Sequence, residues 1–83
     1  MDAILWDEPV QIELRKIGHY RVVTNTREAV ECLMVRWPKN GGPAQAAARR
    51  ICFDVLDGNL PPEAARQAFV DAAVEAGIYV CSK

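Results

Sequence analysis

Two short segments near the start of the sequence alternate between apolar and polar residues. Residues 10–15 read Val-Gln-Ile-Glu-Leu-Arg. Because successive side chains of a strand point to opposite faces, this period of two predicts a strand with one buried face. Residues 17–19 include a glycine and can form the turn into a second strand at residues 20–24. The pattern therefore predicts an antiparallel hairpin.

A helix is predicted after this hairpin. Asn25 can cap its first turn while Glu28 reaches back to a free amide, which is a variant of the capping box. Apolar residues then recur at spacings of three and four up to Trp37. Pro38 disfavours helical backbone in the residue before it, so we expect the helix to end at Trp37.

Two further helices and a last strand follow. Pro43 and Pro62 suit the first turn of a helix, where the missing amide leaves no bond unmade. Gly58 and Gly77 suit the left-handed residue just after a helix end. The apolar faces of both segments are rich in alanine, which allows neighbouring elements to approach closely. Residues 78–81 then form a short final strand.

These elements predict a single α+β domain over residues 1–83. The order is strand, strand, helix, helix, helix, strand (ββαααβ), and a small three-stranded antiparallel sheet packed against three helices would hide its apolar face. A chain of 83 residues buries only roughly 60 to 65% of the surface that its unfolded form exposes. Because a shared interface adds the burial that a small core lacks, we expect a homodimer.

The charge balance argues against several kinds of partner. Ten Lys and Arg residues nearly offset eleven Asp and Glu residues, so the chain has no overall field to attract a nucleic acid or an anionic membrane. The sequence has no apolar run near the roughly 20 residues of a membrane span, and its first residues do not resemble a signal peptide. We therefore expect a cytoplasmic protein without a membrane or nucleic-acid partner.

Little in the sequence indicates catalysis, a cofactor or a metal. Cys32, Cys52 and Cys81 are widely spaced, which argues against a disulfide framework. With His19 they would supply four zinc ligands, but without the close pairs that structural zinc sites use. Buried thiols acting as small apolar side chains are the simpler interpretation. His19 has no identifiable orienting partner, so we expect no enzyme, no metal and no cofactor.

The loop before the second helix is the candidate ligand site. Gly41 and Gly42 precede a helix N-terminus, where free amides and the positive end of the dipole favour anions. Arg36 and Lys39 lie nearby in the sequence. Against this, Pro43 removes one donor and no complete phosphate-binding motif is present. A plain connecting loop is the alternative interpretation.

Four apolar residues fall outside the centres of the expected buried faces and are candidates for an interface. At 100° per residue, Val35 and Phe53 point away from the apolar faces of the first and second helices. Val70 and Val74 widen the apolar face of the third. Either a second subunit or partner protein covers these residues, or the second helix is central and buries Phe53 internally.

Arg66 flanks the apolar face of the third helix. Its stem can pack there while its guanidinium reaches carbonyls or acids at the edge of the domain. A basic patch with Arg49 and Arg50 is the other possibility if the second and third helices are antiparallel. We expect the structural role.

Several short motifs occur together along nearly the whole chain. They are Glu8-Pro9-Val10, Trp37-Pro38, Asp57-Gly58, Ala65-Arg66-x-Ala68-Phe69 and Ala72-Ala73-x-x-Ala76-Gly77. In this order and spacing they resemble the bacterial family called domain of unknown function 982. The resemblance implies a small bacterial soluble domain, and it brings no substrate or catalytic residue with it.

Two hypotheses about function follow. The leading one is a non-enzymatic protein-interaction or regulatory module that acts as a homodimer or binds another protein. The alternative is a small-ligand or anion-binding module that uses Arg36, Lys39, Gly41 and Gly42. The first predicts a concentration-dependent dimer, whereas the second predicts stabilisation by phosphate-containing ligands.

Overall fold

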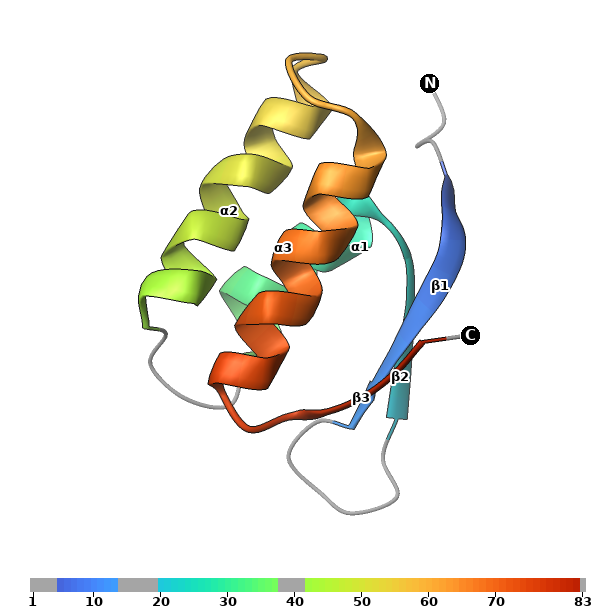
Figure 1. Ribbon diagram of the computed structural model, residues 1–83, viewed down its shortest axis with the longest axis vertical. Helices are drawn as coiled ribbons and strands as arrows, with labels where there is room; N and C mark the ends of the chain where they lie inside the picture. The colour runs from blue at the N-terminus through green and yellow to red at the C-terminus, as the bar shows by residue number, and fades with distance from the viewer. Residues whose placement is uncertain (1–4, 14–19, 38–41, 83) are drawn as a thin grey trace.

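The computed structural model describes residues 5–13, 20–37 and 42–82. Their elements follow in the order β1 (Leu5–Glu13), β2 (Tyr20–Asn25), α1 (Thr26–Glu31), η1 (Cys32–Arg36), α2 (Pro43–Leu56), α3 (Pro62–Glu75) and β3 (Tyr79–Ser82). In this described part, three strands form one antiparallel sheet beside three α-helices (Figure 1). The α+β class is therefore confirmed. The element order departs from the predicted one by the additional π-helix η1.

β1 is the central strand, with β2 and β3 on its two sides. Val10 lies opposite Val23 of β2, and Ile12 lies opposite Val80 of β3. Val10, Ile12 and Val23 are fully buried, because all three point to the face of the sheet that the helices cover. The predicted alternation is confirmed from Val10 as far as Glu13. Residues 14 and 15 of the predicted strand lie outside the described residues.

The first part of β1 differs from the prediction. The strand begins at Leu5, opposite Asn25, and the next pair in the register joins Val10 to Val23. Residues 6–9 therefore face the single residue between Val23 and Asn25. Such a bulge bends its strand and re-aims its side chains. Residues 6–9 do not alternate between apolar and polar side chains as a regular strand does, so the sequence pattern did not predict that β1 extends back to Leu5.

The predicted first helix consists of two parts. Asn25 Oδ1 accepts the backbone N–H of Glu28 (2.9 Å), as the capping motif indicates. Glu28 Oε1 in turn accepts the backbone N–H and the hydroxyl of Thr24. After α1 the turns widen into the π-helix η1, and the residue after it, Trp37, is in extended backbone. Apolar spacings of three and four do not distinguish an α-turn from a π-turn over five residues, so the sequence predicted one continuous helix.

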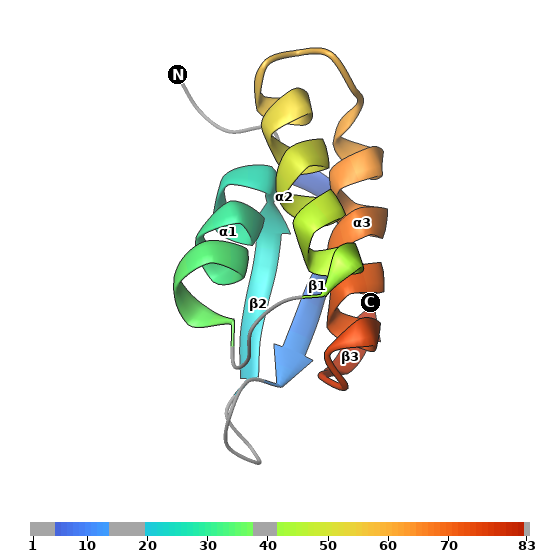
Figure 2. The same cartoon turned by 90° about the vertical axis from the view of Figure 1, so that its left-hand side faces the viewer.

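α2 and α3 begin at the predicted prolines and are followed by the predicted glycines. Pro43 and Pro62 are the first residues of the two helices. Gly58 and Gly77 have φ angles of 86° and 74°, the left-handed region that glycine adopts at low cost. The two helices are antiparallel neighbours in every view (Figures 1 and 2).

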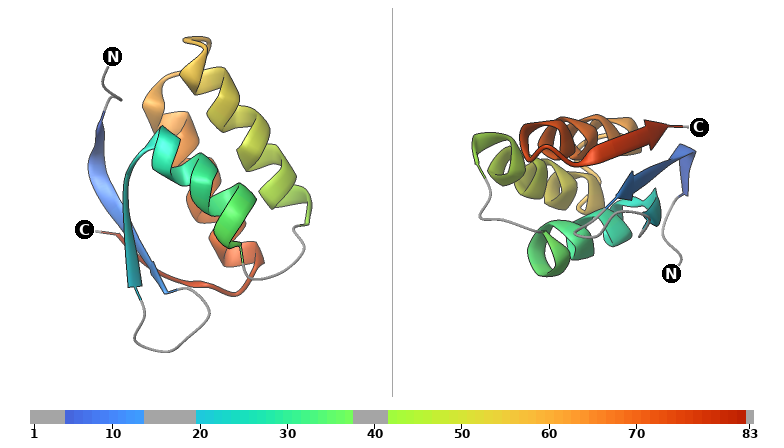
Figure 3. Two further views of the ribbon diagram at one scale, coloured as in Figure 1. Left: turned by 180° about the vertical axis from the view of Figure 1, so that it is seen from behind. Right: turned by 90° about the horizontal axis from the view of Figure 1, so that it is seen from below.

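The helices form two layers over the sheet. α1 lies against β2, and α3 lies against β1 and β3. α2 packs on α1, η1 and α3 as an outer layer, which the view from below shows most clearly (Figure 3).

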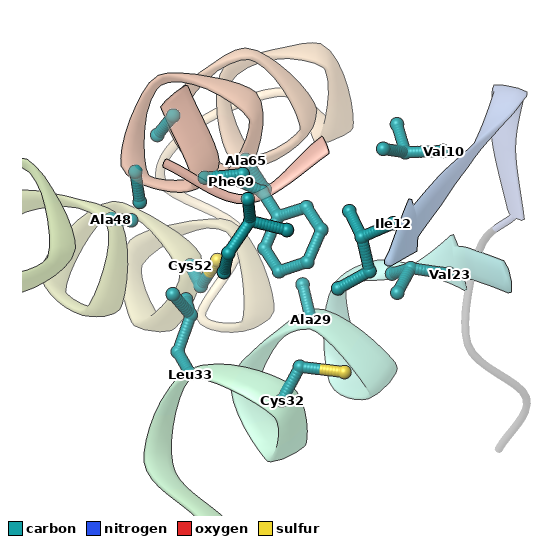
Figure 4. Packing of buried hydrophobic residues seen from close by; sticks show 14 of the residues in the cluster. Val10, Ile12, Val23, Ala29, Cys32, Leu33, Ala48, Cys52, Ala65 and Phe69 are labelled. Atoms are coloured by element: carbon teal, nitrogen blue, oxygen red, sulfur yellow. The ribbon is translucent and has the colours of Figure 1, made fainter. Parts of the chain in front are cut away.

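The core is centred on Phe69 of α3, which is fully buried. Its ring centroid lies 6.0 Å from that of Trp6 and 5.7 Å from that of Trp37. Figure 4 shows side chains from the sheet, α1 and α2 gathered around it. Small residues of α2 and α3 belong to this core, namely Ala48, Cys52, Ala65, Ala68 and Ala72. Their small volume lets the layers approach closely.

Candidate functional site

The N-terminus of α2 already holds an anionic group from the same chain. Glu75, near the end of α3, accepts the backbone N–H of Ala44 at Oε2 (3.0 Å) and that of Gln45 at Oε1 (3.2 Å). Gly42 is the residue before the helix, and a Cβ there would lie 2.7 Å from Glu75 Oε2. Gly42 is therefore explained by the close approach of the carboxylate.

This contact bears directly on the predicted anion site. An external anion would have to displace the Glu75 carboxylate from the two amides. Lys39 and Gly41 lie outside the described residues, as does the side chain of Arg36. Sequence reasoning did not find Glu75, because its partners lie about thirty positions away and no local pattern links them.

The cysteines of the described residues do not indicate a nucleophile. Cys32 and Cys52 are buried free thiols. Burial raises the pKa of the Cys52 thiol from 9.0 to about 11, so it stays protonated near neutral pH and is a weak nucleophile. His19 and the side chain of Cys81 lie outside the described part. Within that part no group of three or more His, Cys, Asp or Glu side chains could hold a metal ion.

The candidate interface residues differ in exposure. Val35 and Val74 are 73% and 66% exposed and Phe53 is 46% exposed, whereas Val70 is partly buried against the core. The half-exposed ring shows that α2 does not bury Phe53 against a second internal layer.

Within the described residues no helix is long and apolar enough to cross a membrane.

Helix geometry separates Phe53 from Val74. Gln45 Nε2 donates to the Leu33 carbonyl oxygen of η1 (2.7 Å), so that side of α2 faces η1. Phe53 lies about 80° further round the helix. Arg66 reaches β1 from α3, and Val74 lies about 80° round α3 from it. Phe53 is thus on the α1 flank and Val74 on the sheet flank, and they do not share one patch.

Val35 lies on a third surface, in η1, one turn beyond the helical residues that contact the outer strand β2. Arg21 of β2 and Glu31 of α1 form an ion pair (3.2 Å), which places this side of the helix along the strand. Val35 follows four positions later. Tyr20 and Val22 are each 50% exposed and point to the open face of the sheet, because they alternate with Arg21 and the buried Val23. We call Tyr20, Val22 and Val35 the β2 edge surface.

A hollow of about 360 Å³ lies where the bulge of β1 meets the start of α3. The bulge contributes Leu5, Trp6 and Glu8. The start of α3 contributes Pro61, Pro62, Glu63 and Arg66. We call this hollow the bulge groove. Its walls combine apolar rings with three charged side chains, so it can contact both apolar and charged parts of a ligand.

Two contacts fix the shape of the bulge groove. Arg66 Nε donates to the Glu8 carbonyl oxygen (2.8 Å), and an amino group of the same guanidinium lies 3.4 Å from Glu8 Oε1. The expectation that Arg66 finds a carbonyl and an acid at the domain edge is confirmed. Trp6 turns inward, where its Nε1–H donates to the buried Thr26 hydroxyl (3.1 Å). The groove therefore has a fixed floor.

Fold and surfaces together define a small α+β domain with an outer helix, a free strand edge and a groove beside a bulged strand. The family model described as protein of unknown function (DUF982) matches residues 8–80. The chain belongs to this family, as the motifs indicated. The segments around Glu8 and Arg66, which carry that resemblance, meet in the bulge groove. Neither a curated protein nor a solved structure matches the chain significantly.

Proposed function

We propose that this protein is a non-enzymatic protein-interaction module that acts as a homodimer through the β2 edge surface. One observation supports this assignment above the others. Among the described residues, β2 has a strand neighbour on one side only, and the half-exposed Tyr20 and Val22 project from its open face. An open strand edge of this kind pairs readily with another strand.

The two sides of β2 offer contacts to an added strand. Alternate side chains of that strand would lie beside Tyr20 and Val22 on the open sheet face and beside Val35 on the helix side. β2 itself has the required alternation, so a second copy of the same strand is the simplest partner. A two-fold contact of this type uses the same patch on both subunits.

The bond between Glu28 and Thr24 limits the length of this contact. The Thr24 amide is already bonded within the chain, so strand pairing would involve mainly Tyr20 to Val23. A short contact gives a weak dimer that dissociates on dilution. The anion-binding alternative would require Glu75 to leave the amides of Ala44 and Gln45, which makes the dimer the stronger proposal.

Sedimentation equilibrium over a wide range of protein concentrations tests the dimer. Val22→Lys places a charge on the open edge, as natural edge strands do to prevent pairing, and should leave a monomer with an unchanged circular dichroism spectrum. Val35→Asp should weaken the dimer as well.

Two variants act as controls, because they change exposed residues on the other flanks. Phe53→Asp and Val74→Asp should leave the dimer intact. If the dimer persists in Val22→Lys and is lost in Phe53→Asp, the interface is on the α1 flank that contains Phe53 and not on the β2 edge surface. A wild-type chain that stays monomeric at the highest concentration would refute the proposal.

A further inference from the structure

We propose that the side of the molecule where α1 and α2 meet is a second docking site, which binds an amphipathic helix with acidic residues beside its apolar stripe. This site, the α1–α2 surface, includes the flank on which Phe53 lies. It consists of Arg27, Val30, Met34, Arg49, Phe53 and Leu56. The proposal adds a class of partner to the interaction role proposed above, and it does not depend on the homodimer.

The first argument is that these residues lie on adjoining sides of two neighbouring helices. α1 and α2 are antiparallel and lie side by side (Figures 2 and 3). Gln45 marks the side of α2 that faces η1, because it bonds to the Leu33 carbonyl there. Arg49 and Phe53 follow Gln45 at spacings of four, so they continue along the same side of the helix.

The matching side of α1 is identified by its contacts with the sheet. Glu28 accepts two hydrogen bonds from β2. Val30 lies about 160° round the helix from Glu28, and therefore faces away from β2 and toward α2. Arg27 comes three positions before Val30 and Met34 of η1 four positions after it, so both extend this side.

The second argument is the exposed apolar area. Met34, Phe53 and Leu56 are each about half exposed, and Val30 is partly buried against the core. Methionine, aromatic residues and arginine are enriched at protein–protein interfaces. A third helix laid along α1 and α2 would cover these side chains, as ridges of one helix pack into the grooves of another.

The third argument is the charge beside this apolar area. Among the described residues, Arg27 and Arg49 take part in no ion pair or hydrogen bond. The Nε of Arg49 is buried without an acceptor, so its stem is packed against the domain and holds the guanidinium in place. Two unpaired guanidinium groups beside an apolar area favour carboxylates on the partner.

The acids near the α1–α2 surface do not neutralise it. Glu31 of α1 already pairs with Arg21. Asp54 comes four positions after Arg50 on the outer side of α2, where the two charges offset each other. Asp57 follows the last turn of α2, at one end of the surface. The middle of the surface is therefore positive, whereas the acids around it disfavour a flat anionic membrane.

Titration of the protein with two synthetic peptides, followed by NMR, tests this assignment. The probe is acetyl-Glu-Ala-Leu-Glu-Glu-Leu-Leu-Glu-Ala-Leu-Glu-Glu-Ala-Leu-amide, and its matched control carries Lys in place of every Glu. The Glu peptide should shift the methyl resonance of Met34 and the amides of residues 27–34 and 49–56. The indole resonance of Trp6 should not shift. The Lys peptide should bind about tenfold more weakly, because its charges repel the arginines.

Variants make the test specific. Arg49→Met keeps a packed stem without the charge, and together with Arg27→Gln it should remove the preference between the two peptides. Phe53→Ala should weaken binding of the Glu peptide about tenfold. Val74→Ala, at an exposed valine on the sheet flank, is the matched control and should leave binding unchanged. Equal binding of both peptides, a preference that persists in the double variant, or shifts confined to other surfaces would overturn the proposal.

Two further measurements address other occupants. Vesicles of phosphatidylserine that displace the Glu peptide would overturn the proposal in favour of a membrane surface. Loss of the dimer in Phe53→Asp would overturn it in favour of a second copy of the chain. Val22→Lys should bind the Glu peptide as the wild type does, so a failed dimer and a failed α1–α2 surface give different results.

Discussion

The contact between Gly42 and Glu75 predicts a coupling that can be measured by a double-mutant cycle. The Glu75 carboxylate accepts two amides in the first turn of α2. Losing a helix cap costs about 1 kcal/mol, and losing a negative charge near a helix N-terminus adds about 0.3–1 kcal/mol. Glu75→Ala should therefore lower the free energy of unfolding by about 1–2 kcal/mol.

Gly42→Ala should also destabilise the protein, by up to the same amount, through a different route. The new Cβ would lie 2.7 Å from Glu75 Oε2 and 2.8 Å from Cδ, so the flexible carboxylate has to shift, which weakens or breaks its hydrogen bonds to Ala44 and Gln45. Alanine reduces the entropy of the unfolded chain, worth about 0.4–1 kcal/mol, but it is a poorer residue than glycine before a helix. These two small effects nearly cancel. In the Glu75→Ala background, Gly42→Ala should consequently change stability by less than about 0.5 kcal/mol.

Urea denaturation followed by circular dichroism, at one protein concentration below dimer formation, gives the four free energies. We expect a positive coupling of up to about 2 kcal/mol, which corresponds to a difference of up to roughly 16 °C in Tm for a domain of this size. Gly58→Ala is the matched control. Gly58 has a φ of 86°, and a Cβ added there would have no atom within 4 Å, so its cost should add to that of Glu75→Ala. Additive costs for Gly42→Ala and Glu75→Ala would refute the explanation given for Gly42.

Two further predictions concern the core. Because burial raises the Cys52 pKa from 9.0 to about 11, the stability that the protonated thiol contributes is fully present below pH 9. It should fall as the pH rises through 11, by up to about 3 kcal/mol above that pH, and Cys52→Ala should show a smaller decline in urea melts across that range. Thr26→Val removes the acceptor of the Trp6 indole N–H and should cost about 1–3 kcal/mol. Thr26→Ser keeps the hydroxyl, so equal losses in both variants would exclude the hydrogen bond as the cause.

Elements that depend on neighbouring residues could be predicted from the sequence. The Asn25 cap, the first-turn prolines and the glycines after α2 and α3 each act within a few positions, and the structure has them in the predicted roles. The alternation in β1 likewise reports directly on burial from Val10 onward.

Features that join distant residues could not be predicted in this way. The cap of α2 by Glu75 and the contact between Arg66 and Glu8 connect different ends of the chain. The bulge removes the period of two on which strand prediction depends. For this reason the groove, which combines the bulge with the Arg66 contact, emerged only from the structure. The predicted Arg36 and Lys39 site depended on local sequence alone and did not include the competing carboxylate.

The position of β1 between β2 and β3 has a consequence for how the chain folds. The β1–β2 hairpin joins segments that are close in sequence, whereas Ile12 meets Val80 only after all three helices have been made. Such non-local pairing slows folding relative to a helical bundle. During synthesis, β1 is expected to keep one edge open until β3 has left the ribosome, so the nascent chain is most prone to wrong strand pairing before that point.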